Sequence, residues 1–231
     1  MKESPFIVAF DCAEFSEAAT LADQLDPALC RAKVGKELFT ACGMPVIDML
    51  HKKGYQVFLD LKFHDIPNTV AKAVAVAAKN DVWMLNVHAS GGPRMMDAAR
   101  DAVDRLRATT LLIAVTMLTS LEQSDCDFLG LTRSLSDQVI ALADGAKESG
   151  LDGVVCSAQE AAELKAHLGS DFLLVTPGIR PQLDSGDDQR RTLTPMQALE
   201  QGSDYLVIGR PVTQAADPRA FLLQLLSEIS S

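Results

Sequence analysis

The sequence has no stretch rich in proline, glycine or serine that would mark a linker between domains, and it has no glutamine-rich or mucin-like tract. It is 231 residues long and 48% of these are hydrophobic, enough apolar side chains to bury one large core. We therefore expect a single domain over residues 1–231.

Positive charge is scarce as well, with 21 lysines and arginines against 31 aspartates and glutamates and a net charge of −10. An excess of negative charge opposes binding to nucleic acids and to anionic membranes. Long hydrophobic runs are also missing: the apolar run at residues 6–10 is closed by Asp11, too short for a signal peptide or a spanning helix. We expect a cytoplasmic protein without nucleic-acid or membrane partners, and any anion it binds should be small.

Cysteine is present but follows no binding pattern. The five cysteines are odd in number, widely spaced and contain no C-x-x-C pair, which argues against a disulfide framework and against a zinc site. They are predicted to be reduced packing residues. They are Cys12, Cys30, Cys42, Cys126 and Cys156.

Short apolar runs rich in β-formers alternate with longer amphipathic segments along the whole chain. The runs lie at residues 6–10, 32–34, 57–61, 83–87, 111–118, 153–155, 172–175 and 205–208, and the helix-like segments at 16–25, 67–79, 94–106, 137–149, 158–167, 195–201 and 218–229. Buried strands that alternate with helices predict a parallel sheet covered by helices. Eight such units in this length favour an α/β fold of the (β/α)₈ TIM-barrel type, with a doubly wound open sheet as the alternative.

The segment around residue 60 carries three charges within six residues. Asp60 and Lys62 alternate along a predicted strand, so both side chains should project from the same face, while Asp65 follows in the turn before a helix. A solvated salt-bridge patch is one interpretation. Asp11 and Lys33 also place charges at the ends of predicted strands, however, and this recurrence favours a functional site.

In a (β/α)₈ barrel the active site lies at the carboxyl ends of the strands, and phosphate is commonly held after strands seven and eight. Arg180 and Arg210 follow those two predicted strands within glycine-containing turns. Glycine allows close backbone approach to an anion, and the arginine fork fits phosphate oxygens, so both arginines are candidate phosphate ligands rather than ordinary surface residues. The polar segment 181–194 has no periodicity and is predicted to be a lid, with Gln189 able to reach a ligand.

Seven short motifs follow one another along the predicted strands. They are AFD at 9–11, KVGK at 33–36, DLKFHDIPNT at 60–69, NVHA at 86–89, LTS at 118–120, TPGIR at 176–180 and VIGRP at 207–211. D-x-K-x-x-D alone is moderately specific, but together with the closing motifs it is highly specific. By these motifs the chain closely resembles the orotidine 5′-phosphate decarboxylase family of the bacterial type, essentially from end to end.

The resemblance implies that a homodimeric barrel decarboxylates orotidine 5′-monophosphate to uridine 5′-monophosphate, without a cofactor or metal, in pyrimidine nucleotide biosynthesis. It implies that Lys62 is the catalytic lysine and proton donor, in a charge network with Asp60, Asp65 and Lys33. It also implies that Asp65 and Thr69 reach the site of the neighbouring subunit. The substrate-binding residues that it implies are Asp11, Lys33, Asp60 and Thr69, Thr119 and Ser120 at the pyrimidine, Gln189 from the lid, and Arg180, Gly209 and Arg210 at the phosphate.

Two other functions are consistent with parts of this pattern. A sugar-phosphate decarboxylase or epimerase of the same barrel type would use Mg²⁺, and Asp11, Asp60 and Asp65 could supply oxygen ligands. The ammonium of Lys33 in the same cluster opposes a divalent ion. A phosphate-binding barrel without catalysis is the other possibility, which the complete set of charged residues disfavours. His64 and His88 each follow a buried strand and are expected to pack or hydrogen-bond rather than bind metal.

Overall fold

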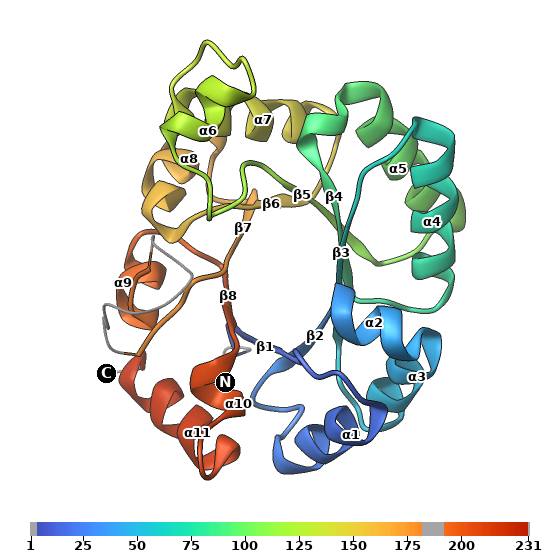
Figure 1. Cartoon of the computed structure of the whole chain (residues 1–231), viewed down its shortest axis with the longest axis vertical. Coiled ribbons are helices and arrows are strands. Elements are labelled where there is room, and N and C mark those ends of the chain that lie inside the picture. The colour runs from blue at the N-terminus through green and yellow to red at the C-terminus, as the bar shows by residue number, and fades with distance from the viewer. Residues whose placement is uncertain (1–3, 182–191, 231) are drawn as a thin grey trace.

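The computed structural model describes residues 4–181 and 192–230. Eight parallel strands close into a barrel in sequence order, each paired with its neighbours, and β1 pairs with β8 (Figure 1). The strands are β1 (Phe6–Ala9), β2 (Arg31–Gly35), β3 (Val57–Phe63), β4 (Met84–His88), β5 (Leu111–Val115), β6 (Gly153–Val155), β7 (Leu173–Thr176) and β8 (Tyr205–Ile208). The predicted (β/α)₈ barrel is therefore confirmed, and the open sheet is excluded.

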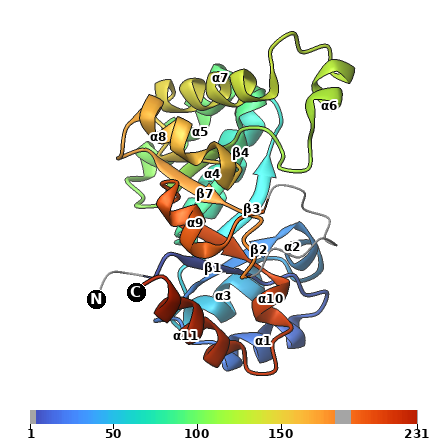
Figure 2. The ribbon, with the colours of Figure 1, turned by 90° about the vertical axis from the view of Figure 1, so that its left-hand side faces the viewer.

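The helices form a ring around the barrel, as Figures 1 and 2 show. They are α1 (Phe15–Gln24), α2 (Lys36–Cys42), α3 (Met44–Lys52), α4 (Pro67–Lys79), α5 (Pro93–Leu106), α6 (Gln123–Phe128), α7 (Leu135–Glu148), α8 (Ala161–Leu168), α9 (Pro195–Glu200), α10 (Arg210–Thr213) and α11 (Pro218–Glu228), with 3₁₀ turns η1 (Ala89–Gly91) and η2 (Ala158–Glu160). The helices α2, α3, α6 and α10 were not predicted. Three of them, α2, α6 and α10, are too short to give a clear amphipathic period, whereas α3 buries Val46, Ile47 and Leu50 at a helical spacing that was not recognised.

Two strands differ from the sequence-based ranges by more than one residue at an end. The fifth predicted strand, 111–118, ends at Val115, since the chain beyond it leaves the ladder and lines the cavity described below. The third, 57–61, continues to Phe63 and passes through an irregularity in its pairing with β4. Both differences lie at the carboxyl end of the barrel, where the chain departs from regular strand geometry.

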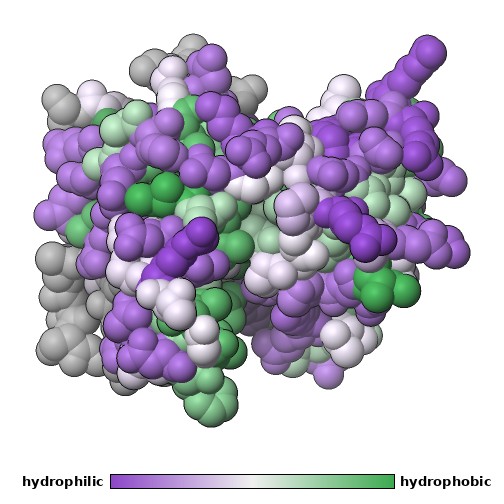
Figure 3. Space-filling model, turned by 90° about the horizontal axis from the view of Figure 1, so that it is seen from above, coloured by the Kyte–Doolittle hydropathy of each residue, from purple (hydrophilic) through white to green (hydrophobic). Residues whose placement is uncertain are grey.

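Apolar side chains fill the barrel and the space between strands and helices. The inner cluster consists of Ile7, Ala9, Phe58, Met84, Ile113, Val175 and Val207. Three of the five cysteines are buried in the core and the other two pack against it, which agrees with the predicted packing role. Hydrophilic residues predominate on the face shown in Figure 3, with hydrophobic ones in scattered patches.

The amino-terminal end of the barrel is closed by a stacked arginine. The guanidinium of Arg31, the first residue of β2, lies 4.5 Å from the ring centroid of Trp83 and 5.0 Å from that of Tyr205. It also donates hydrogen bonds to the Gln56 side chain at 2.8 Å and to the Ser4 carbonyl at 2.7 Å. This end is therefore a packed structural layer, which leaves the opposite end for a binding site. Among the described helices, none has the length and apolar character needed to cross a membrane.

Candidate active site

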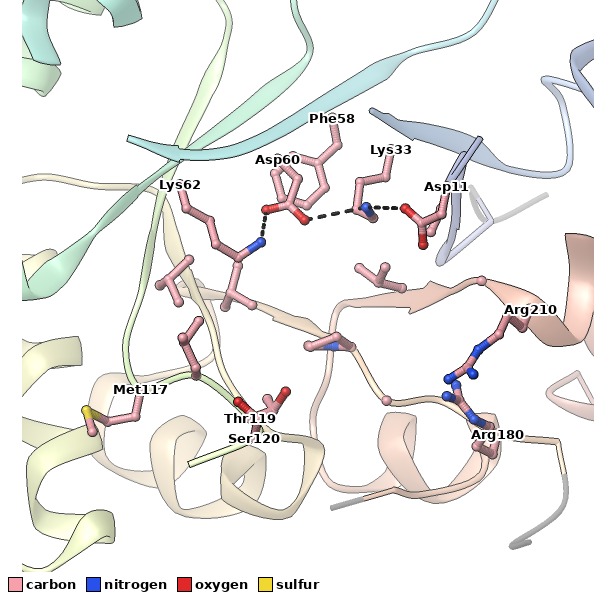
Figure 4. Close-up of a pocket in the computed structure, with 18 residues that line it drawn as sticks. Asp11, Lys33, Phe58, Asp60, Lys62, Met117, Thr119, Ser120, Arg180 and Arg210 are labelled. Carbon is pink, nitrogen blue, oxygen red and sulfur yellow. Dashed lines mark hydrogen bonds and ion pairs between the residues drawn. The ribbon is translucent and has the colours of Figure 1, made fainter. Parts of the chain in front are cut away.

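A cavity of about 430 Å³ opens at the carboxyl end of the barrel. Its floor is apolar, formed by Ala9, Phe58, Val115, Val155 and Val207, which belong to five different strands. The polar residues that line it are Asp11, Lys33, Asp60, Lys62, Thr119, Ser120, Arg180 and Arg210 (Figure 4). The sequence predicted all eight of these side chains as site residues, and the structure brings them together in one cavity.

Four of these side chains form an alternating line of charges, here called the charge row: Asp11, Lys33, Asp60 and Lys62 (Figure 4). The Lys33 ammonium lies 3.2 Å from Asp11 Oδ1 and 3.6 Å from Asp60 Oδ2. The Lys62 ammonium lies 2.5 Å from Asp60 Oδ1. Strands β2 and β3 are neighbours, with Gly35 opposite Asp60, and this pairing places the two lysines on either side of one carboxylate.

Burial makes the charge row more than a surface patch. The side chains of Lys33, Asp60 and Lys62 are 10%, 13% and 24% exposed, whereas that of Asp11 at the outer end is 63% exposed. Charges removed from water interact more strongly than solvated ones, so each inner charge depends on its neighbour. Within the charge row, the solvated salt-bridge interpretation therefore fits only Asp11.

The ionisation of Asp60 reflects this arrangement. Burial raises the pKa of Asp60, but the ammonium groups of Lys33 and Lys62 and hydrogen bonds from Lys62 and Asn86 outweigh it, so the pKa lies below its usual value. Asp60 is therefore a carboxylate at neutral pH. Because the pKa of Asp60 is lower in the folded state, its ionisation adds to the free energy of unfolding. This contribution is complete at pH values above the pKa of the unfolded state, about 4, and it is lost as the pH falls through the pKa of the folded state.

Lys62 reaches the cavity through an unusual backbone conformation. Its φ is +53°, in the left-handed region that a residue with a Cβ enters only at a cost of roughly 1–2 kcal/mol. Around it, β3 and β4 lose their regular register between Leu59 and Phe63. The Lys62 N–H donates to Asn86 Oδ1 at 2.8 Å, and Asn86 Nδ2 donates to Asp60 Oδ1 at 2.7 Å. The predicted shared face of Asp60 and Lys62 is present, but it depends on this irregularity.

Two arginines occupy the other end of the cavity. Arg180 follows β7 after Gly178, whose φ of +80° suits glycine, and Arg210 follows β8 and Gly209 as the first residue of α10. In Figure 4 their side chains point toward one another. Like charges at one end of a cavity create a positive potential, and planar guanidinium groups match the oxygens of a phosphate.

Several predicted site residues are not in the cavity. Asp65 and Thr69 are exposed at the start of α4, and the carboxylate of Asp65 accepts a hydrogen bond from the Ile66 N–H at 2.7 Å. They do not line the cavity of their own subunit. Gln189 and most of the predicted lid at 181–194 lie outside the described residues.

The two histidines contact each other beside the charge row. The ring centroids of His64 and His88 are 5.4 Å apart. Burial, together with the charges of His64, Lys62 and Lys36, lowers the pKa of His88 to about 4, so His88 is neutral at neutral pH. Among the described residues, no group of three or more histidine, cysteine or acidic side chains is arranged to hold a metal ion. Between Asp11 and Asp60 the cationic group is the ammonium of Lys33.

Asn86 belongs to the NVHA motif but was not predicted to be a site residue. A single buried asparagine gives no signal in the sequence, and its contacts depend on the irregular register of β3 and β4. The alternation rule that identified Asp60 and Lys62 could not reveal it.

Comparisons with known proteins agree with this geometry. Residues 4–225 match the profile of the Orotidine 5′-phosphate decarboxylase / HUMPS family. The chain is 56% identical to the orotidine 5′-phosphate decarboxylase of Saccharophagus degradans over 97% of this chain and 94% of that protein. It is 58% identical to that of Chromobacterium violaceum over 98% and 92%. A solved structure of the enzyme from Lactobacillus acidophilus superposes with a TM-score of 0.87 at 40% identity, over 99% of this chain and 100% of that one.

Proposed function

The chain belongs to the orotidine 5′-phosphate decarboxylase / HUMPS family, and on that premise we propose that it converts orotidine 5′-monophosphate to uridine 5′-monophosphate and CO₂ in pyrimidine nucleotide biosynthesis. The observation that carries the proposal is the charge row, which directs the ammonium of Lys62 into a cavity with two arginines at its far end. This geometry suits a substrate that develops negative charge at a carbon atom and carries a phosphate some distance from it.

Lys62 supplies the chemistry of the proposed reaction. When the bond between pyrimidine C6 and the carboxylate breaks, its electron pair remains in an sp² orbital at C6, with no adjacent carbonyl to delocalise it. A preorganised ammonium in a water-poor cavity stabilises this localised charge. The same ammonium then transfers a proton to C6 and gives uridine 5′-monophosphate, so the reaction needs no cofactor.

The rest of the charge row keeps Lys62 charged and directed. Asp60 holds the Lys62 ammonium at 2.5 Å, and Lys33 keeps Asp60 ionised from the other side. We assign Asp11 and Lys33 to the ribose hydroxyls as well, because they lie between Asp60 and the arginine end of the cavity in Figure 4. Thr119 and Ser120, which follow β5 on the side facing Lys62, are assigned to the pyrimidine.

A second subunit completes the proposed site. Asp65 and Thr69 are exposed at the start of α4, next to Ile66, a hydrophobic residue that is 67% exposed. We assign both residues to the neighbouring subunit's site in a homodimer, where Asp65 adds a carboxylate beside that subunit's Lys62. Gln189 is assigned to the base and phosphate, and it lies outside the described residues.

The direct test is to follow the absorbance of orotidine 5′-monophosphate on mixing with the protein, before and after dialysis against EDTA. We expect rapid turnover that EDTA leaves unchanged, because the Lys33 ammonium already lies between the carboxylates of Asp11 and Asp60. No turnover would contradict the proposal. Turnover of a sugar phosphate that EDTA abolishes and Mg²⁺ restores would establish the metal-dependent alternative instead.

Arg210→Ala tests the phosphate end. A charged hydrogen bond contributes about 1.5–3 kcal/mol, so KM is expected to rise about tenfold to a hundredfold, with a smaller change in kcat. Arg105→Ala is the matched control, since that side chain is 79% exposed on α5. Steady-state kinetics measures both variants. An unchanged KM in Arg210→Ala would remove this residue from the phosphate site.

A further inference from the structure

Lys62 is the only non-glycine residue with positive φ that lies within a strand of the described chain. The other two, Asp81 and Arg107, follow the ends of α4 and α5, where this conformation is common. Between the pairs Leu59–Leu85 and Phe63–Val87, β3 advances four residues while β4 advances two. The irregularity turns the Lys62 N–H away from the ladder, so another group must bind it.

Asn86 provides that group. It lies in the middle of β4 with 0% exposure, and its Oδ1 accepts the Lys62 N–H at 2.8 Å. Its Nδ2 donates to Asp60 Oδ1 at 2.7 Å, the same oxygen that accepts the Lys62 ammonium at 2.5 Å. One amide therefore joins the backbone of Lys62 to the carboxylate that orients its side chain. Among uncharged side chains, only a primary amide offers both a carbonyl acceptor and an N–H donor at this spacing.

The second of these bonds distinguishes Asn86 from an ordinary buried amide. The bond to the Lys62 N–H would be enough to satisfy the irregular backbone. The bond to Asp60 holds the same carboxylate oxygen that accepts the Lys62 ammonium. Asn86 does not line the cavity, so it acts through these two residues.

We propose that Asn86 is a positioning residue for the proposed decarboxylation, holding the Lys62 backbone in its left-handed conformation and Asp60 against the Lys62 ammonium. The expected effect on kcat rests on the proposed function. The hydrogen bonds by which Asn86 holds the Lys62 backbone and Asp60 do not depend on it. Asn86 touches no substrate, and its replacement should therefore reduce kcat far more than it changes KM.

Asn86→Asp tests the proposal while preserving the shape of the side chain. It places a second carboxyl group where Nδ2 now lies 2.7 Å from Asp60 Oδ1. Repulsion between two carboxylates at this distance raises the pKa of the pair, so the two groups share one proton as the pH is lowered and lose it at higher pH. The protonated form can still donate to Asp60 and accept from Lys62. The other titratable or charged groups nearby are Lys62 on β3, Lys33 on β2, His88 on β4 and His64.

We expect kcat of Asn86→Asp to be about ten to a hundredfold below wild type at pH 8 and to recover as the pH is lowered toward 5, a trend absent from the wild type. Asn80→Asp is the matched control, an exposed amide at the end of α4 that should leave kcat and the pH profile unchanged. A wild-type profile in Asn86→Asp would overturn the proposal. The proposal would also be overturned if the activity of Asn86→Asp fell only at those pH values where urea denaturation shows that the variant is unfolded.

The second measurement does not depend on activity. Hydrogen exchange of the Lys62 amide, followed by NMR, should be at least tenfold faster in Asn86→Ala than in wild type, with the Ile7 amide on β1 unchanged. Asn86→Ser serves if the alanine variant does not fold. An unchanged exchange rate of the Lys62 amide would refute the proposal that Asn86 holds the Lys62 backbone. If the wild type failed to decarboxylate the nucleotide while exchange at Lys62 still increased, the proposed function would fail and the hold would stand.

Discussion

Replacing Lys62 with alanine is expected to remove nearly all turnover of orotidine 5′-monophosphate while leaving nucleotide binding in place. The variant loses both the proton donor and the ammonium that stabilises the electrons at C6. General acids contribute about 10²–10⁴-fold and preorganised electrostatic groups about 10²–10³-fold, so kcat should fall by about 10⁴-fold or more. Arg180 and Arg210 remain at the other end of the cavity, so uridine 5′-monophosphate should still bind in a calorimetric titration.

Lys52→Ala is the matched control, because that lysine is exposed on α3 and lies outside the cavity. Its kcat should equal that of the wild type. A wild-type rate in Lys62→Ala would refute the mechanism assigned to the charge row. Loss of nucleotide binding together with activity would instead show that the variant had lost the architecture of the site.

Asp65→Ala is also expected to lose activity, by about 10²-fold or more, and to recover it when mixed with Lys62→Ala. In the proposed homodimer each site takes Lys62 from one subunit and Asp65 from the other. A mixed dimer then has one site that lacks both residues and one that is intact. Random assembly of equal amounts makes half of the dimers mixed, so about one quarter of wild-type activity should return after coexpression or joint refolding.

The control for this experiment is a mixture of Lys62→Ala and Lys33→Ala. Both residues belong to the charge row of one subunit, so every site in a mixed dimer lacks one of them and no activity should return. Failure of the Asp65→Ala mixture to recover would show that Asp65 does not serve a neighbouring subunit. Recovery in both mixtures would point to a fault in the assay.

Much of the site could be predicted because its residues follow simple rules. Parallel strands all end at the same side of a barrel, so charged residues after successive strands, such as Asp11 and Asp60, had to lie near one another. Alternation along β3 also predicted that Lys62 and Asp60 share a face, and the two side chains are in contact in the structure. These predictions need only the period of a strand and the topology of the barrel, both of which can be inferred from the sequence.

The remainder depends on geometry that no periodic pattern contains. The alternation rule assumes a regular strand, whereas Lys62 has a φ of +53° and reaches Asp60 through an irregularity that Asn86 supports. Asp65 is predicted to act in another subunit, and a single chain cannot display that contact. The helices α2 and α6 were missed because each is too short to produce a clear hydrophobic face.

The apolar layer inside the barrel also determines from which end a ligand can reach the cavity. Arg31, stacked on Trp83 and Tyr205, closes the amino-terminal end, and the inner cluster fills the space between that end and the cavity floor. Within the described residues the cavity therefore has no route through the barrel to its amino-terminal end. A bound nucleotide should therefore exchange with solvent at the carboxyl end of the barrel, where the charge row and the two arginines lie.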